Sequence, residues 1–233
     1  LDRDHYAAFV ELHIEQGPIL ERERIPIGVV TAIAAPAALR VRIEGEGGHA
    51  GTVLMPDRKD ALCAAAEMVL AVEAAAKATG SSDTVATTGI CRVHPGASNS
   101  IPSTVTLEID VRDIDLDRRD RVVRVLQTVI AQRAAVRRVR ADVELLNADP
   151  PATMADEIIA AAESACRDLG LRTKRMVSRA YHDSLFMAQV CPTGMVFIPC
   201  RGGVSHRPDE YATPGAIRAG VEVLARTLAA LAG

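Results

Sequence analysis

Two histidine-bearing stretches at opposite ends of the chain have residue types that suit a metal site. The first, residues 10–18, reads Val-Glu-Leu-His-Ile-Glu-Gln-Gly-Pro, so apolar residues alternate with Glu11, His13 and Glu15. This period of two predicts a strand that carries His13 on its polar face between two carboxylates. A carboxylate can hold one ring nitrogen of a histidine and leave the other for a metal ion. An exposed, charged strand face is an equally good interpretation of this stretch alone.

The second stretch, residues 202–210, reads Gly-Gly-Val-Ser-His-Arg-Pro-Asp-Glu and follows an apolar strand predicted at residues 195–199. Its glycines allow the backbone to approach another segment closely, and Asp209 and Glu210 could orient His206. Imidazole suits zinc, manganese and iron. Two histidines do not complete a catalytic metal site, which needs about three protein ligands, and the chain contains no HxD or HExxH motif. Taken alone, the motif is more simply a loop histidine beside a helix cap.

Three residues in the middle of the chain could bind an acidic ligand. His49 lies in the glycine-rich loop 47–52, Asn99 in the segment Ala-Ser-Asn-Ser-Ile-Pro, and Arg112 at the end of an alternating strand. The planar guanidinium of arginine matches a carboxylate bidentately, and an asparagine can add a donor beside it. A turn asparagine and a surface arginine are the commoner fates of these residue types.

His182 belongs to a third stretch, Ser-Arg-Ala-Tyr-His-Asp-Ser at residues 178–184. His182 and Asp183 stand where a helix is predicted to begin, so a helix cap beside a hydrogen-bonded histidine is the default interpretation. The neighbouring residues also make His182 a candidate for the wall of a site.

The elements that must position these residues follow from periodicity and from glycine and proline. Helices are predicted at 2–9, 18–24, 57–77, 116–140, 156–169, 181–189 and 213–231, and strands at 10–15, 27–33, 39–44, 84–93, 105–111, 141–146, 172–177 and 194–199. The stretch 39–146 has the order β-α-β-β-α-β, which indicates a ferredoxin-like layer. Prolines near residues 36 and 150 suggest hinges. We therefore predict an α/β protein in which a domain at 36–149 is inserted into one made of 1–35 and 150–233.

Composition excludes several classes of function. A net charge of −3 without an aromatic-rich basic tract argues against nucleic acid as a partner, and no apolar run is long enough to cross a membrane. The five scattered cysteines form no CxxC pair, which favours reduced thiols and a cytoplasmic protein. Because the chain begins with Leu1 and enters a helix-like segment at once, we expect it to be the C-terminal part of a longer protein.

Taken in order, these motifs resemble the amidohydrolase family that contains N-carbamoyl-L-amino-acid hydrolase, β-alanine synthase, allantoate amidohydrolase and ureidoglycolate amidohydrolase. The resemblance covers nearly the whole chain and rests on residues 11–18, 47–51, 99–102, 110–112, 182–183 and 205–210. The run 178–187, with Phe-Ile-Pro-Cys at 197–200, is most similar to the ureidoglycolate branch. The glycine-histidine loop alone also occurs in related dimeric metallopeptidases.

The resemblance implies a zinc-peptidase-like catalytic domain with an inserted ferredoxin-like lid that also forms a homodimer. It implies two divalent metal ions, zinc or manganese, that activate water for attack on a ureido or amidino carbon. His13 would ligate one ion and His206 the other, and Gln16 and His182 would line the substrate pocket. Asn99 and Arg112 would hold the substrate carboxylate, and His49 would reach the partner's site and polarise the carbonyl group under attack.

This sequence departs from the family pattern in one respect. The His-x-Asp pair, the bridging aspartate and the Glu-Glu pair of the family are absent from these residues. We therefore expect that the 233-residue chain alone does not turn over a substrate. Two alternatives stay open at this stage: a catalytically inactive remnant that dimerises or binds a small acid, and a dimeric metallopeptidase.

Overall fold

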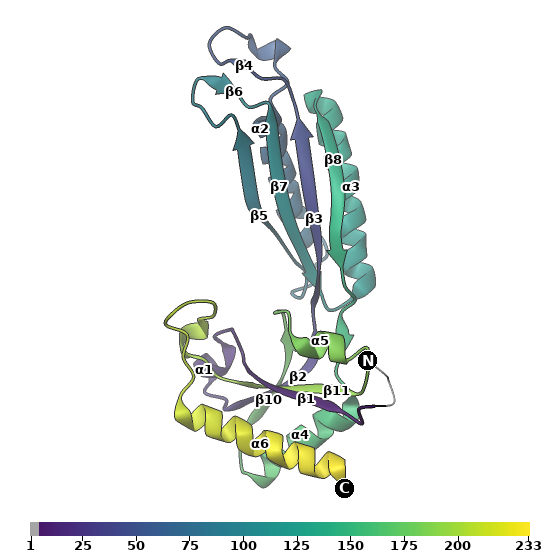
Figure 1. The fold of residues 1–233 in the computed structure, drawn as a ribbon, viewed down its shortest axis with the longest axis vertical. Coiled ribbons are helices and arrows are strands. Elements are labelled where there is room, and N and C mark those ends of the chain that lie inside the picture. Colours follow the sequence, from purple (N-terminus) through teal and green to yellow (C-terminus); the bar gives the residue numbers. More distant parts are fainter. Residues whose placement is uncertain (1–4) are drawn as a thin grey trace. The chain divides into compact units, whose positions relative to one another are not determined.

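Residues 5–233 are described by the structure, which is a computed structural model (Figure 1). The chain divides into two units: unit 1 consists of residues 1–35 and 151–233, and unit 2 of residues 36–150. Each unit has its own buried core. The mixed α/β class expected from the sequence is confirmed.

A five-stranded sheet forms the centre of unit 1, with the order β1-β11-β2-β10 and a short β9 on β2. β1 and β11 are parallel, as are β2 and β10, whereas β11 and β2 are antiparallel. The strands are β1 (Phe9–Ile14), β2 (Ile27–Ile33), β9 (Ala152–Thr153), β10 (Thr173–Ser178) and β11 (Thr193–Ile198). Because β1 and β11 run in the same direction, the segments that follow them leave from the same edge of the sheet.

The helices of unit 1 are α1 (Ile19–Glu23), α4 (Asp156–Asp168), α5 (Asp183–Met187) and α6 (Pro214–Ala232). α6 packs directly on β1, since a Cβ atom added at Gly220 would lie 2.7 Å from Leu12 Cδ1. Leu12 and Ile14 therefore face the core beneath the sheet. The pleat turns Glu11, His13 and Glu15 to the opposite face, where α5 lies (Figure 1).

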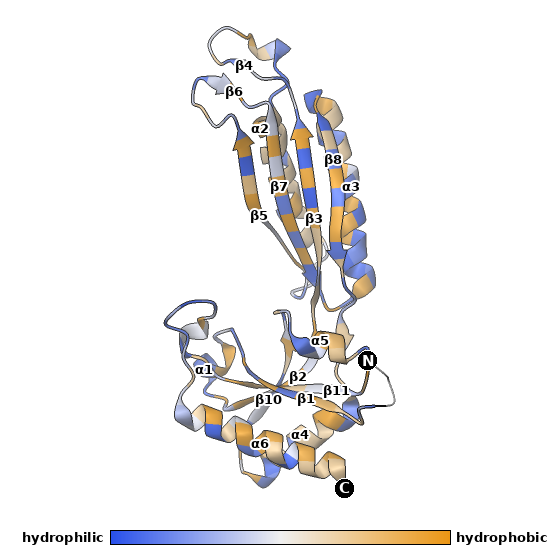
Figure 2. Ribbon diagram, viewed as in Figure 1, coloured by the Kyte–Doolittle hydropathy of each residue, from blue (hydrophilic) through white to orange (hydrophobic). Residues whose placement is uncertain are grey.

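Unit 2 has a four-stranded sheet with the order β5-β7-β3-β8. Two helices cover one of its faces, and in Figure 2 apolar and polar residues alternate along the strands. The elements are β3 (Ala35–Glu44), α2 (Ala61–Lys77), β5 (Val85–His94), β7 (Thr104–Asp113), α3 (Leu116–Arg137) and β8 (Arg140–Ala148). The uncovered face is charged and carries ion pairs such as Arg40 with Glu108. A small two-stranded sheet joins β4 (Gly48–His49) to β6 (Ser100–Ile101).

Several predicted helix boundaries were wrong. Residues 5–8 are not helical and β1 begins at Phe9, whose N–H bonds Pro192 O in the sheet; the predicted cap Asp2 lies outside the described residues. α2 starts at Ala61 rather than at residue 57, because Asp60 caps it through the Leu62 and Cys63 N–H groups. α3 ends at Arg137 because Arg138 is left-handed, with φ 56°.

α5 is also shorter than the predicted 181–189 and runs from Asp183 to Met187. No helix within residues 5–233 combines the length and hydropathy needed to cross a bilayer. All five cysteines are free thiols, and three of them, Cys166, Cys191 and Cys200, are buried.

Candidate metal and substrate site

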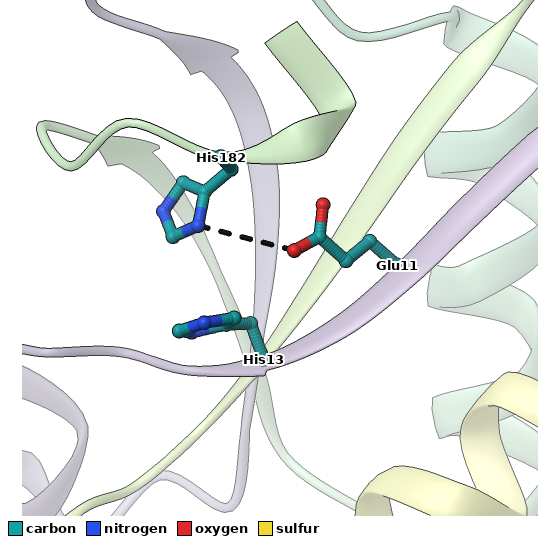
Figure 3. A group of neighbouring side chains, drawn as sticks. All are labelled: Glu11, His13 and His182. Atoms are coloured by element: carbon teal, nitrogen blue, oxygen red, sulfur yellow. Dashed lines mark ion pairs between the residues drawn. The ribbon is translucent and has the colours of Figure 1, made fainter. Parts of the chain in front are cut away.

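The candidate site of unit 1 lies at the polar face of β1, where the side chains of Glu11, His13 and His182 gather (Figure 3). One candidate ligand atom from each residue lies within 4.8 Å of the other two. The rings of His13 and His182 meet edge to face, with centroids 4.7 Å apart. The sequence placed His13 and His182 169 positions apart, and nothing in its periodicity predicted this contact.

The ring of His13 is oriented for metal binding. Its Nδ1 lies 2.8 Å from the carbonyl oxygen of Ile14 and donates to it in the neutral ring. Nε2 then keeps its lone pair, which is the arrangement that metal-ligating histidines use. The backbone carbonyl group of Ile14 thus orients His13, and neither of the two carboxylates suggested by the strand pattern does so.

Glu11 and Glu15 instead cap two short helices. Oε2 of Glu11 accepts hydrogen bonds from Ser184 N–H at 3.0 Å and from Ser184 Oγ at 2.6 Å. Glu15 is a buried residue, and its carboxylate accepts hydrogen bonds from the N–H groups of Ile19 and Leu20. Carboxylates favour the N-terminal end of a helix, where N–H groups lack partners. His13, which lies between Glu11 and Glu15 in the sequence, caps neither helix.

His182 is buried and electrically neutral at ordinary pH. Its side chain is 2% exposed, and Nε2 forms a 2.8 Å hydrogen bond with Ser178 Oγ. Burial, with a smaller contribution from His13, lowers the pKa of His182 to about 4. His182 therefore offers a neutral ring to whatever occupies the space beside His13.

We expect the buried His182 to make unit 1 sensitive to acid. Because the pKa of His182 is lower in the folded state than its ordinary value of about 6.5, the unfolded chain binds the extra proton first and unfolding becomes easier as the pH falls from about 6.5 to about 4. The loss should reach about 3 kcal/mol at the lower end, since each pKa unit corresponds to about 1.4 kcal/mol.

Tyrosine fluorescence during urea unfolding measures this effect, because Tyr6, Tyr181 and Tyr211 all lie in unit 1. Urea unfolding curves of the metal-free chain and of a His182→Gln variant are recorded at pH 7, 5.5 and 4.5. The variant should have the shallower dependence on pH. Equal dependence in both proteins would contradict the assignment.

The loop that carries His206 is anchored to the end of β1. Gln16 Nε2 donates to Ser205 Oγ at 2.7 Å, and Gly202 N–H donates to Glu21 Oε2 at 2.7 Å. A Cβ atom at Gly203 would lie 2.7 Å from the backbone of Gly17 and Pro18, so the close approach expected of these glycines occurs here.

His206 itself is exposed and has a left-handed backbone, with φ 57°. Glu210 accepts the backbone N–H of His206, and Asp209 pairs with Arg207. These two carboxylates therefore do not hold the imidazole in the way the sequence suggested. His206 also lies outside the group formed by Glu11, His13 and His182. Its pairing with His13 across two metal ions stays a prediction.

Unit 2 brings His49 and Asn99 together at one end of its sheet. β4 and β6 pair His49 with Ser100, and Ala50 N–H bonds the carbonyl oxygen of Asn99. The His49 ring is exposed, and its Nδ1 accepts a 3.0 Å hydrogen bond from Gly51 N–H. In the neutral ring the proton is then on Nε2, which makes His49 a hydrogen-bond donor toward its surroundings.

Arg112 lies at the other end of β7. That strand begins at Thr104, opposite His94, and Arg112 pairs with Val85. Arg112 lies eight positions beyond Thr104 on this extended strand, a separation of about 26 Å. One copy of unit 2 therefore cannot place Asn99 and Arg112 on the same carboxylate, and the expectation that these two residues share a substrate carboxylate stays a prediction. Asp110 orients Arg112 by accepting from Nε at 2.7 Å and from Nη2 at 3.0 Å.

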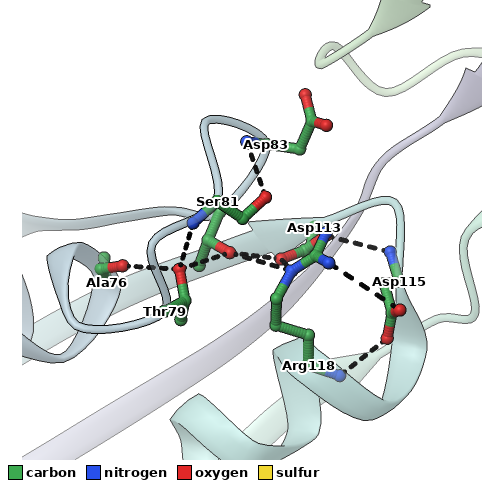
Figure 4. Close-up of polar contacts among 8 residues, drawn as sticks. Ala76, Thr79, Ser81, Asp83, Asp113, Asp115 and Arg118 are labelled. Atoms are coloured by element: carbon green, nitrogen blue, oxygen red, sulfur yellow. Dashed lines mark hydrogen bonds and ion pairs between the residues drawn. The ribbon is translucent and has the colours of Figure 1, made fainter.

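A buried polar network holds the end of β7 immediately after Arg112 (Figure 4). Asp113 is fully buried and accepts hydrogen bonds from Arg118 Nε at 2.7 Å, from the Thr84 hydroxyl and from Asp115 N–H. Burial alone would raise the pKa of Asp113, but these donors outweigh it and hold the pKa below its ordinary value. The network joins the ends of α3, β7 and the segment before β5.

We expect Asp113→Asn to destabilise unit 2 by about 3 kcal/mol, because it leaves the Arg118 guanidinium without its buried partner. Unit 2 contains no tyrosine or phenylalanine, so its unfolding is seen by circular dichroism but not by tyrosine fluorescence. Since the folded-state pKa is lowered, the contribution of Asp113 is present above about pH 4 and lost as the pH falls below it.

Glu73→Gln is the matched control, because it breaks an exposed ion pair with Lys77 on α2. Exposed pairs of this kind contribute at most about 0.5 kcal/mol. Equal urea midpoints for the two variants would show that the Asp113 network has no special role.

Comparisons with known proteins agree on one family. Residues 1–230 match the model of peptidase family M20/M25/M40. The chain is 56% identical to a ureidoglycolate hydrolase of Oryza sativa subsp. japonica, covering 99% of this chain and 48% of that protein. It is 40% identical to an N-carbamoyl-L-amino-acid amidohydrolase of Pseudomonas sp. (strain NS671), covering 96% of this chain and 53% of that protein.

A solved structure shows the same similarity. The crystal structure of AtUAH in complex with (S)-hydroxyglycine superposes with a TM-score of 0.92 at 54% identity, over 99% of this chain and 55% of that one. The chain thus spans about half the length of the relatives it matches.

Proposed function

Because the chain belongs to peptidase family M20/M25/M40, we propose that it forms part of a metal-dependent amidohydrolase that cleaves a C–N bond of a linear ureido acid with release of ammonia. The orientation of His13, with Nε2 left for a metal ion, is the observation that carries this proposal. Identity is higher to the ureidoglycolate hydrolase than to the N-carbamoyl-L-amino-acid amidohydrolase, which favours ureidoglycolate as the substrate.

We assign His13 and His206 as ligands of two divalent metal ions, zinc or manganese. Imidazole suits both metals, so the ligand types do not choose between them. Bound metal ions would supply activated water and stabilise developing negative charge. The remaining ligands and the general base would come from outside these 233 residues.

The other residues bind and orient the substrate. Gln16, fixed by Ser205, and His182 line the pocket beside His13. Arg112 binds the substrate carboxylate, and a planar guanidinium distinguishes an acid from a neutral amide. His49 donates Nε2–H to the carbonyl oxygen under attack, where a fixed donor stabilises the negative charge that develops.

We propose that the protein acts as a homodimer in which the partner subunit contributes His49 and Asn99. Within one unit 2 these two residues lie at the opposite end of β7 from Arg112. Two subunits are therefore required if all three residues contact one small substrate. His49 is exposed and has its donor nitrogen outward, which suits a residue that acts on a partner.

A substrate panel tests the proposal. The complete protein is assayed for ammonia release from ureidoglycolate, allantoate, N-carbamoyl amino acids and dipeptides. We expect the highest kcat/KM for ureidoglycolate, by at least about tenfold, which corresponds to about 1.4 kcal/mol of discrimination. Preference for dipeptides would contradict the assignment. The 233-residue chain alone is the negative control, because His13 and His206 fall short of a complete metal site.

A further inference from the structure

We propose that Glu11 is a positioning residue, which holds His182 against His13 by capping helix α5. This inference rests on the proposed function, in which His13 ligates a metal ion and His182 lines the substrate pocket. It adds a residue that neither contacts the substrate nor binds the metal.

Helix α5 depends on contacts from outside its own segment. α5 has only five residues, Asp183–Met187, and its N-cap residue His182 makes no side-chain capping bond. A helix this short has no stability of its own in water, so its first turn depends on outside contacts. Glu11 supplies them, because its Oε2 accepts from both the N–H and the Oγ of Ser184.

The cap that Glu11 provides also determines where His182 lies. His182 directly precedes α5, and its Nδ1 is 3.9 Å from Oε1 of Glu11. Glu11 and His13 are two residues apart on one strand, and β1 is fixed by its parallel pairing with β11. A single carboxylate thus joins the start of α5 to the strand that carries His13, across 173 positions of sequence.

Glu15, which directly follows β1, is a carboxylate that takes no part in the cluster. It caps α1 in the same way, through Ile19 and Leu20, but His182 is not among its hydrogen-bond partners. The alternative role for Glu11 is that of a metal ligand beside His13 and His182. Two hydrogen bonds engage its Oε2, so Oε1 is the oxygen that could bind an ion, and the metal content of Glu11→Gln distinguishes the two roles.

The first experiment uses the metal-free 233-residue chain and needs no substrate. Long-range ¹H–¹⁵N spectra give the imidazole signals of the six histidines, assigned with His13→Gln and His182→Gln. Glu11→Ala should shift the signals of His182 and His13 at constant pH. Glu11→Gln should restore them largely, because its amide oxygen can still accept from Ser184.

Thr213→Ala is the matched control. Thr213 caps α6 in the same unit through Ala216 N–H, so its loss costs a helix cap without touching α5. Its histidine spectrum should equal that of the unsubstituted chain. Unchanged His182 signals in Glu11→Ala would overturn the proposal.

The second experiment uses the complete protein with its metal. Glu11→Ala should lower kcat/KM for the ureido acid about 30-fold, within the 10- to 100-fold range typical of residues that orient a site, and Glu11→Gln should stay within about threefold. Metal content should be unchanged in both. Loss of a metal equivalent in Glu11→Gln would make Glu11 a ligand and refute the positioning role. If ureido acids are not substrates but the spectra shift as described, the proposed function fails and the positioning role stands.

Discussion

Replacing His13 by alanine should lower kcat of the complete protein by about 10³-fold or more, with loss of bound metal. The hydrogen bond from Nδ1 to the Ile14 carbonyl oxygen leaves the lone pair of Nε2 for the proposed metal ion. A metal ion contributes several kcal/mol to this kind of hydrolysis, and about 4 kcal/mol corresponds to a factor of about 10³. Metal analysis and steady-state kinetics measure the two effects on the same preparation.

His5→Ala is the control for this substitution. His5 is also a histidine of unit 1, but it is exposed, and its ring meets the ring of Tyr6 edge to face. It should keep full metal content and activity. His13→Ala with full metal content and a kcat within about tenfold of the unsubstituted protein would remove His13 from the metal site, since tenfold is only about 1.4 kcal/mol.

Arg112→Ala should raise KM for the ureido acid about 100-fold with a smaller change in kcat. Hydrogen bonds to charged groups contribute about 1.5–3 kcal/mol, and about 2.7 kcal/mol corresponds to 100-fold. Asp110 holds the guanidinium by Nε and Nη2, and the Asp113 network fixes the next residue of β7. The Arg112 guanidinium is therefore oriented before a substrate binds, which reduces the conformational entropy lost on binding.

A neutral analogue sharpens this experiment. If the substrate carboxylate is replaced by a carboxamide, the KM of the unsubstituted protein should rise. The KM of Arg112→Ala should be nearly the same for the carboxamide and for the acid. Arg112→Lys should recover only part of the effect, because an ammonium group cannot bind a carboxylate bidentately. Arg92→Ala, an exposed arginine on the neighbouring strand β5, is the control. If Arg112→Ala raises KM equally for the acid and for the carboxamide, Arg112 does not contact the substrate carboxylate.

Alternation of residue types predicted much of the fold. Leu39, Val41 and Ile43 are buried on β3, and Leu107 and Ile109 on β7, as their period of two indicated. Long helices such as α2 and α6 were recognised from their helical periodicity. The predicted boundaries were wrong where a capping side chain decided them, as at Asp60, because a periodic pattern does not distinguish a capping residue from the first residue of a helix.

The candidate site was predicted in part. The strand pattern placed His13 on the polar face, and the glycines before His206 indicated the close approach that Gly203 makes. The roles of Glu11 and Glu15 as caps could not be predicted, and neither could the contact of His13 with His182. The separation of Asn99 from Arg112 along β7 was also missed.

The sequence by itself determined which residues alternate along each strand and helix, and therefore which side of β1 carries its histidine. Only the tertiary structure decided which distant groups that histidine meets. The physical reason is that periodicity is a property of consecutive residues, whereas the contacts of Glu11, His13 and His182 depend on strand order and on how loops return to the sheet.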